Sequence, residues 1–332
     1  MRKRLLIAAI LFLSLLLWNN LHSPQTAQSW GFYGHKRINR MAVFTLPPGM
    51  IGFYKKHVDF ISEHAVDPDK RRYANPDEAP RHYIDIDHYG AHPFDSVPLF
   101  WKQAVAKYGE DTLQAYGIVP WHIDKMLYRL TEAFREGNVD KILHYSADIG
   151  HYIADAHVPL HTTENYNGQL TGQHGIHGFW ESRVPELEAE SYDYWLGRAR
   201  YVDQPQQKAW DFVKASHAAV DSVLRFEREL TASFPGDRKY AFENRGNSTI
   251  KTYSEEFSLS YSKMLNGMVE RRMRESIIMV GSFWYTAWVN AGQPDLVRLE
   301  TKEVSDSLKK IFEQEEYLWK NGKVKNPKGH ED

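Results

Sequence analysis

The sequence predicts an all-α fold, organised as a single mostly helical domain. Apolar residues recur at helical spacing in run after run of the 332-residue chain, whereas the alternation expected of strands is scarce. The most helical region extends from Ser254 to Asn290 and is stopped by Gly292 and Pro294. Its apolar side chains are expected to form core, because buried helices of soluble proteins carry such residues.

Residues 1–29 are predicted to be a secretory signal peptide. Three basic residues lead into an apolar run from Leu5 to Trp18, which is shorter than the ~20 residues needed to cross a bilayer. The small residues Ala27 and Ser29 precede an expected cleavage site before Trp30. The protein is therefore expected to be exported, to the periplasm or the medium. The alternative is an uncleaved N-terminal membrane anchor.

Composition limits the possible classes of protein. The chain has no cysteine, so neither disulfides nor a lipid attached to cysteine can hold it, and ~300 residues suffice to bury a core without them. Removal of the leader, with three basic and no acidic residues, leaves 38 Lys and Arg against 43 Asp and Glu, a net charge of −5. That charge is not typical of a general nucleic-acid binder. No nucleophile elbow, HExxH or phosphate-loop motif indicates another mechanism.

Further helices are expected along the chain from the same periodicity and from proline and glycine stops. The first, around Ile38–Phe44, should end before Pro47 and Pro48. The others are Ile51–Val66, Phe100–Tyr108, Ile123–Phe134 with the helix that follows it, Pro185–Arg200 and Gln206–Phe234. Residues 301–332 are predicted to form a charged C-terminal helix and a flexible tail.

The stretch from His144 to Glu181 is rich in histidine and carboxylate side chains. Residues four apart lie on one face of a helix and can close on one ion. The candidates in this stretch are His151 with Asp155, His161 after the helix-ending Pro159, and His177 with Glu181. Imidazole and carboxylate ligands without competing cysteine are typical of zinc sites.

More candidate ligands lie upstream. If the leader is cut before Trp30, the new amine and the carbonyl of that residue can bind a metal that His35 also binds. Asp67 or Asp69 is available as a carboxylate ligand, and His82 as an imidazole ligand. The pattern of residues leaves both aspartates open.

This ordered set of ligands resembles that of the trinuclear zinc phosphodiesterases. That superfamily includes bacterial zinc-dependent phospholipases C and the single-strand-specific zinc nucleases of fungi and plants. The match extends from Trp30 to Glu181, roughly half of the chain. The resemblance implies three Zn²⁺ ions with helices bundled around them. It divides the chain into a signal peptide (1–29), a catalytic domain (30–300) and the C-terminal helix and tail (301–332).

The resemblance also implies which residues hold each ion. The first ion would be bound by Asp67, His82, His151 and Asp155, the second by Trp30, His35 and the bridging Asp155, and the third by His161, His177 and Glu181. The spacing to His82 favours Asp67 over Asp69 within the family. Asp67 is then also the expected catalytic residue, which orients the attacking water or accepts its proton.

The implied function is an exported, zinc-dependent phosphodiester hydrolase of the phospholipase C type, in which a zinc-bridged hydroxide attacks phosphorus in line. Glu181 and the acidic charge favour phospholipid as the substrate. The short spacing from Trp30 to His35 is typical of the nucleases, so single-stranded DNA or RNA is the alternative. A zinc-binding protein that catalyses no reaction is a more remote alternative. No obligate protein partner is expected. Contact with a membrane is expected only where the membrane is the substrate surface.

Four aromatic residues next to predicted ligands could serve either substrate, as stacking platforms for bases or as an apolar approach for lipid. They are Tyr33, Tyr83, Tyr166 and Phe179.

Overall fold

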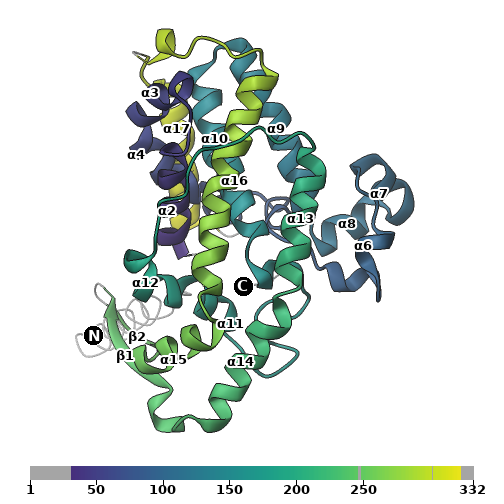
Figure 1. The fold of residues 1–332 in the computed structure, drawn as a ribbon, viewed down its shortest axis with the longest axis vertical. Coiled ribbons are helices and arrows are strands. Elements are labelled where there is room, and N and C mark those ends of the chain that lie inside the picture. Colours follow the sequence, from purple (N-terminus) through teal and green to yellow (C-terminus); the bar gives the residue numbers. More distant parts are fainter. Residues whose placement is uncertain (1–30, 246–247, 301, 323–332) are drawn as a thin grey trace, which may run out of the picture.

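The computed structural model describes residues 31–245, 248–300 and 302–322. The predicted signal peptide, Trp30 and the tail from residue 323 lie outside the described residues. Within the described ranges the chain is a single mostly helical domain, which confirms the all-α prediction (Figure 1). None of the helices in these ranges is both long and apolar enough to span a membrane.

The N-terminal helices follow the predicted stops. The first helix ends before Pro47, since proline lacks the amide hydrogen that would continue a helix, and Pro48 begins the next helix, where that hydrogen is not needed. The predicted helix Ile51–Val66 is divided into shorter pieces at His57 and His64. The elements are α2 (Gly31–Val43), α3 (Pro48–Lys56), α4 (Val58–Glu63), η1 (His64–Val66) and α5 (Asp67–Arg71).

The middle of the chain contains two long helices joined by a tight turn. Gly137 has a positive φ of 59°, which ends the first of them, and the Asn138 side chain accepts a hydrogen bond from the Lys141 amide at the start of the second. The elements are η2 (Ala79–Arg81), η3 (Ile86–Tyr89), α6 (Pro93–Ser96), α7 (Trp101–Tyr108), α8 (Glu110–Tyr116), α9 (Val119–Glu136), α10 (Val139–Ala156) and η4 (Pro159–Thr162).

The second half of the chain surrounds the helix α16. Its elements are α11 (Ile176–Gly178), η5 (Phe179–Arg183), α12 (Val184–Glu188), η6 (Ala189–Ser191), α13 (Pro205–His217), α14 (Val220–Ser233), η7 (Gly236–Arg238), β1 (Tyr240–Arg245), β2 (Ser248–Tyr253), α15 (Glu255–Leu265), α16 (Met268–Asn290), η8 (Val297–Leu299) and α17 (Asp306–Asn321). The two strands form an antiparallel hairpin, with Tyr240 opposite Tyr253. The sequence did not predict this hairpin.

The predicted helix Pro185–Arg200 is wrong beyond Ser191. The chain continues without regular structure because its backbone amides find partners outside a helix. The Ala199 amide donates to the Thr45 carbonyl at 2.8 Å, and the Arg200 amide donates to Ser282 Oγ at 3.1 Å. Tertiary hydrogen bonds therefore override helix propensity in this segment.

Two other predicted helices are each two helices in the structure. Gln206–Phe234 is divided between α13 and α14, and Ser254–Asn290 between α15 and α16. The second break falls at Asn266 and Gly267, both with positive φ, a conformation that ends a helix at low cost for these residue types. The helical content was predicted correctly, but not these turns.

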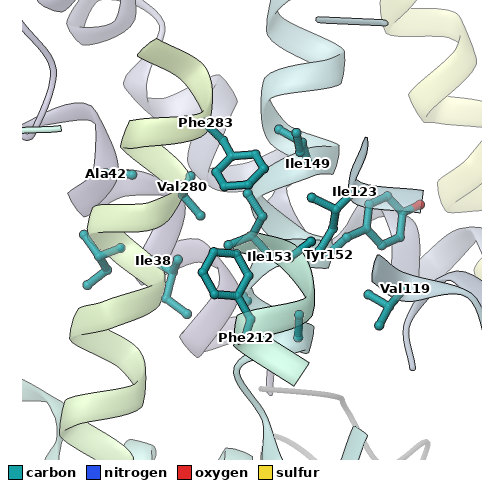
Figure 2. Packing of buried hydrophobic residues seen from close by; sticks show 14 of the residues in the cluster. Ile38, Ala42, Val119, Ile123, Ile149, Tyr152, Ile153, Phe212, Val280 and Phe283 are labelled. Atoms are coloured by element: carbon teal, nitrogen blue, oxygen red, sulfur yellow. The ribbon is translucent and has the colours of Figure 1, made fainter. Parts of the chain in front are cut away.

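The core lies where α2, α9, α10, α13 and α16 meet (Figure 1). Figure 2 shows Ile153 of α10 beside Phe212 and Phe283, with Ile149 on the next turn of the helix. These four side chains are essentially inaccessible to solvent. One face of α10 is thus fixed by apolar packing, and the rest of the helix carries His151 and Asp155 at a defined position.

Candidate metal centre

Helix α10 supplies the two central residues of the site, His151 and Asp155, both fully buried. The His151 Nδ1–H donates to the Ala65 carbonyl at 2.8 Å. This bond fixes the tautomer and leaves Nε2 as the nitrogen that can bind a metal. Histidines that bind metals typically donate their other ring N–H in this way.

Four side chains converge to form what we call the first group: Asp69, His82, His151 and Asp155. His82 Nδ1 lies 2.9 Å from Asp155 Oδ2, 3.0 Å from His151 Nε2 and 3.7 Å from Asp69 Oδ1. His151 Nε2 lies 3.2 Å from Asp155 Oδ2 and 3.5 Å from Asp69 Oδ1. Neighbouring ligands of a tetrahedral zinc ion, with bonds of ~2.0–2.1 Å, are about 3.3 Å apart. The atoms of His82, His151 and Asp155 therefore have the spacing of three ligands of one such ion, and Asp69 Oδ1 lies within 3.7 Å of both histidines.

Asp67 was expected in this group, whereas the structure places Asp69 there. Asp67 accepts a hydrogen bond from His64 Nδ1 at 2.6 Å and lies 3.3 Å from Lys70 Nζ. Residues two apart on a helix point in nearly opposite directions, so α5 directs only one of the two aspartates to His82. Both carboxylate oxygens of Asp69 are buried and have no hydrogen-bond donor among the described residues.

The charges of the first group favour a bound cation. Burial raises the pKa of Asp69 to about 8, with His35 lowering it and the nearby Asp155 raising it. Burial also opposes ionisation of Asp155, but His151 and His161 hold the pKa of that carboxyl well below its usual range. Burial lowers the pKa of His82, so its ring is neutral at pH 7 and can donate a lone pair. Two buried carboxylates this close are stabilised by a metal ion between the ligands.

The second group begins with His35 on α2. Its Nε2 lies 3.4 Å from Asp155 Oδ1, whereas the other oxygen of Asp155 faces His82. The two carboxylate oxygens thus point to two different groups, which is the arrangement of a bridging ligand. Ligand atoms of His35, Asp69 and His151 lie within 4.8 Å of one another. Trp30, the remaining predicted ligand of this group, lies outside the described residues.

The third group contains His161, His177 and Glu181, as predicted. Glu181 Oε2 lies 3.0 Å from His177 Nε2 and 3.4 Å from His161 Nε2. Although burial opposes its ionisation, the nearby His177 and His161 lower the pKa of Glu181 to about 2. His161 Nδ1 donates to the His82 carbonyl at 2.7 Å, which ties this group to the first. His177 is half-buried, whereas the other two ligands are buried, so the third group is the one nearest to solvent.

One residue that supports the site, Glu78, was missed in the sequence. Its side chain is fully buried, accepts hydrogen bonds from Tyr152 and Arg81, and lies 3.8 Å from His82 Nε2. Glu78 thus lies beside the nitrogen of His82 that points away from the other ligands, at a distance longer than a hydrogen bond. The signal was present, since Glu78 and His82 have the same four-residue spacing as the recognised pairs.

The four aromatic residues next to ligands have different environments. Tyr83 and Phe179 are buried, so neither offers an open face to a substrate. The Tyr33 hydroxyl donates to Glu190 at 2.5 Å. Only Tyr166 among the four has its ring beside the third group, 6.2 Å from the His177 ring.

No protein-family model matches the chain, and no curated protein matches it closely enough to count as a relative.

Proposed function

We propose that this protein is a zinc-dependent phosphodiester hydrolase of the phospholipase C type. The observation that carries the proposal is the position of Asp155, whose two oxygens face His35 and His82 respectively. A carboxylate shared in this way would hold two ions as a pair, and paired ions are typical of enzymes that cleave phosphate esters. A structural zinc site, by contrast, is usually closed by four ligands to one ion.

The donor set fits zinc. It consists of imidazoles and carboxylates in a chain without cysteine, and His82, His151 and Asp155 have the spacing of ligands to one ion. When bound, zinc would polarise phosphoryl oxygens and lower the pKa of a bound water towards ~7. We propose Asp69, in place of Asp67, as the carboxylate that orients this water or accepts its proton, because Asp69 is the one that faces the ligands.

The surroundings of the third group support phospholipid as the substrate. Tyr83 and Phe179 are buried and cannot stack on bases. Leu170, on the loop between His161 and His177, is 71% exposed, so this loop presents apolar surface to solvent. A lipid substrate needs such a surface, whereas a nuclease needs open aromatic rings. Tyr166 is the residue that keeps the nuclease alternative open.

The test compares two substitutions two positions apart. In the zinc-loaded protein, Asp69→Asn should lower turnover of phosphatidylcholine by about 10²-fold or more and reduce bound zinc, because a ligand is lost. Asp67→Asn is the matched control and should keep both turnover and zinc. Equal losses in the two variants would contradict the assignment of Asp69.

The substrate class is tested in the same assay. Release of phosphocholine that stops when a chelator is added would support the phospholipase type. Chelator-sensitive release of nucleotides from single-stranded DNA would support the nuclease instead. Absence of both activities in a fully zinc-loaded protein would favour a zinc-binding protein without turnover.

A further inference from the structure

A cavity of about 520 Å³ lies between η2, α7, α8 and α9, apart from the three metal groups. Its inner wall contains buried residues, including Ile118, Trp121 and His122, whereas most of its charged residues are exposed at the rim. Half-buried Trp101, Gln114 and Arg81 lie between the two zones. The cavity thus has a buried inner wall and a charged entrance, as small-molecule sites commonly do.

Two buried polar atoms of the lining have no hydrogen-bond partner among the described residues. His122 is only 4% exposed, and its Nε2 has no partner. The Gln114 Oε1 atom is likewise buried and accepts no hydrogen bond. Burial and the positive charges of Arg81 and Lys125 lower the pKa of His122, so the ring is neutral and can accept a hydrogen bond. Unpaired buried polar atoms are rare in folded proteins, and a ligand that donates hydrogen bonds would satisfy Gln114 Oε1 and, in the tautomer protonated at Nδ1, His122 Nε2.

The lining carries more negative than positive charge. The positive charge of Arg81 is already balanced by its ion pair with the buried Glu78. Lys125 then faces Glu110, Asp111 and Asp124, none of which forms an ion pair with a described residue. Burial raises the pKa of Asp124, so a cation beside it would stabilise its ionised form.

Two tryptophan rings in the wall of the cavity are also suited to a positively charged ligand. The rings of Trp101 and Trp121 lie 5.6 Å apart at an angle of 65°. Tryptophan attracts cations to its ring face more strongly than the other aromatic residues. A metal ion is disfavoured as the occupant, because no lining residue belongs to a described cluster of ligand atoms within 4.8 Å of one another.

From these features we infer that the cavity binds a small organic ammonium ion with N–H groups. The ammonium would donate hydrogen bonds to Gln114 Oε1 and His122, with Asp124 balancing its charge and Trp101 covering its carbon atoms. The site does not depend on the proposed hydrolase activity. It is nevertheless close to the metal centre, because the His122 ring packs 4.5 Å from the ring of Tyr152, whose hydroxyl donates to Glu78.

The test is a titration of the zinc-loaded protein with ethanolamine, followed by calorimetry and by the fluorescence of tryptophan. Choline, which has no N–H group, and acetate, which has the opposite charge, are the comparison ligands. We expect saturable binding of ethanolamine, weaker binding of choline and none of acetate. Binding of choline as tight as that of ethanolamine, or no saturable binding of ethanolamine, would overturn the inference.

Substitutions locate the binding. Gln114→Leu and Asp124→Asn should each weaken ethanolamine binding about tenfold, which corresponds to about 1.4 kcal/mol. Both residues line an open cavity rather than the core, so the variants should keep the helical circular dichroism of the wild type. Asp237→Asn, at an exposed carboxylate on η7, is the matched control and should bind as the wild type does. Binding unchanged by the two cavity substitutions would place the ammonium elsewhere and overturn the inference.

Discussion

The two aspartates of α5 show that the direction of a side chain decides which carboxylate can join the candidate metal site. Asp67 and Asp69 are both buried, yet the first is paired with His64 and Lys70, and the second faces His82 and His151. The pattern of residues alone leaves both open, because each is a carboxylate at a suitable distance along the chain, and the resemblance favours Asp67, which is not the one that faces the histidines. The choice is made by the rotation of a five-residue helix, which packs against α10 and α17. Such a rotation follows from tertiary contacts and cannot be predicted from local periodicity.

The pair His144–Asp148 on α10 makes stability depend on pH. His144 Nε2 lies 3.4 Å from Asp148 Oδ2, which also accepts from Arg71 at 2.7 Å. Burial disfavours the charged ring, but Asp148 outweighs burial and raises the pKa of His144. A group with a raised pKa stabilises the folded state below its ordinary pKa of ~6.5, and this contribution is lost as the pH rises through the folded value.

We therefore expect His144→Gln to destabilise the protein more at pH 6 than at pH 9. The loss at pH 6 should be about 1.5 kcal/mol, the lower range for a hydrogen bond to a charged group. Urea unfolding of both proteins at the two pH values measures the difference. An equal loss at pH 6 and pH 9 would show that the charge of His144 does not contribute.

At the scale of elements, α17 covers the segment that carries Asp69. Phe312 packs against His64 and Phe60, with ring centroids 3.9 and 5.7 Å apart, and Glu316 lies 2.7 Å from Lys70. Further along, the ring of Trp319 lies 5.5 Å from Phe32 at the start of α2. The C-terminal helix thus holds both α5 and the beginning of α2, which follows Trp30 directly.

Phe312→Ala should destabilise the protein by about 3 kcal/mol and weaken one zinc site. The loss reflects a cavity under α17, and the weaker zinc site follows because α5 is less firmly held. Chemical unfolding and the zinc content after dialysis measure the two effects. Ile311→Ala, at a half-exposed position on the same helix, is the control and should cost less than about 1 kcal/mol. Full zinc retention in Phe312→Ala would contradict the proposed link.

Periodicity predicted most of the helices because their apolar faces repeat with the helical period. The stops at Pro47 and Gly292 were visible as residue types. The hairpin of β1 and β2 was not, because its six-residue strands carry charged and polar residues and are held by contacts distant in sequence. Arg183 donates to the Tyr253 carbonyl and to Glu243, and these bonds join the hairpin to η5.

At the scale of the whole molecule, the three groups of candidate ligands join segments that are far apart in the chain. The described ligands come from α2, α5, the residue after η2, α10, η4, α11 and η5. The sequence predicted seven of these eight positions, from His35 to Glu181, and favoured Asp67 where the structure brings in Asp69. Short spacings on one helix could be recognised, whereas the convergence of distant segments needs the fold.

Removal of metal should therefore lower the stability of the entire domain. We expect a chelator to lower the midpoint of thermal unfolding by at least about 5 °C, since an ion bound only to the folded state stabilises it by several kcal/mol. Added zinc should restore the midpoint. Scanning calorimetry with and without chelator measures the shift, and an unchanged midpoint would show that the metal groups do not contribute to folding stability.

The burial of the candidate ligands would also limit the rate at which bound ions exchange with solvent. His151 and Asp155 have no contact with solvent, so an ion held by them can leave only when the surrounding helices open. An ion held beside the half-buried His177 has a shorter path to solvent. The three ions would thus differ in residence time, and the slowest to exchange would be the one held by the first group, whose release is limited by motion of the fold.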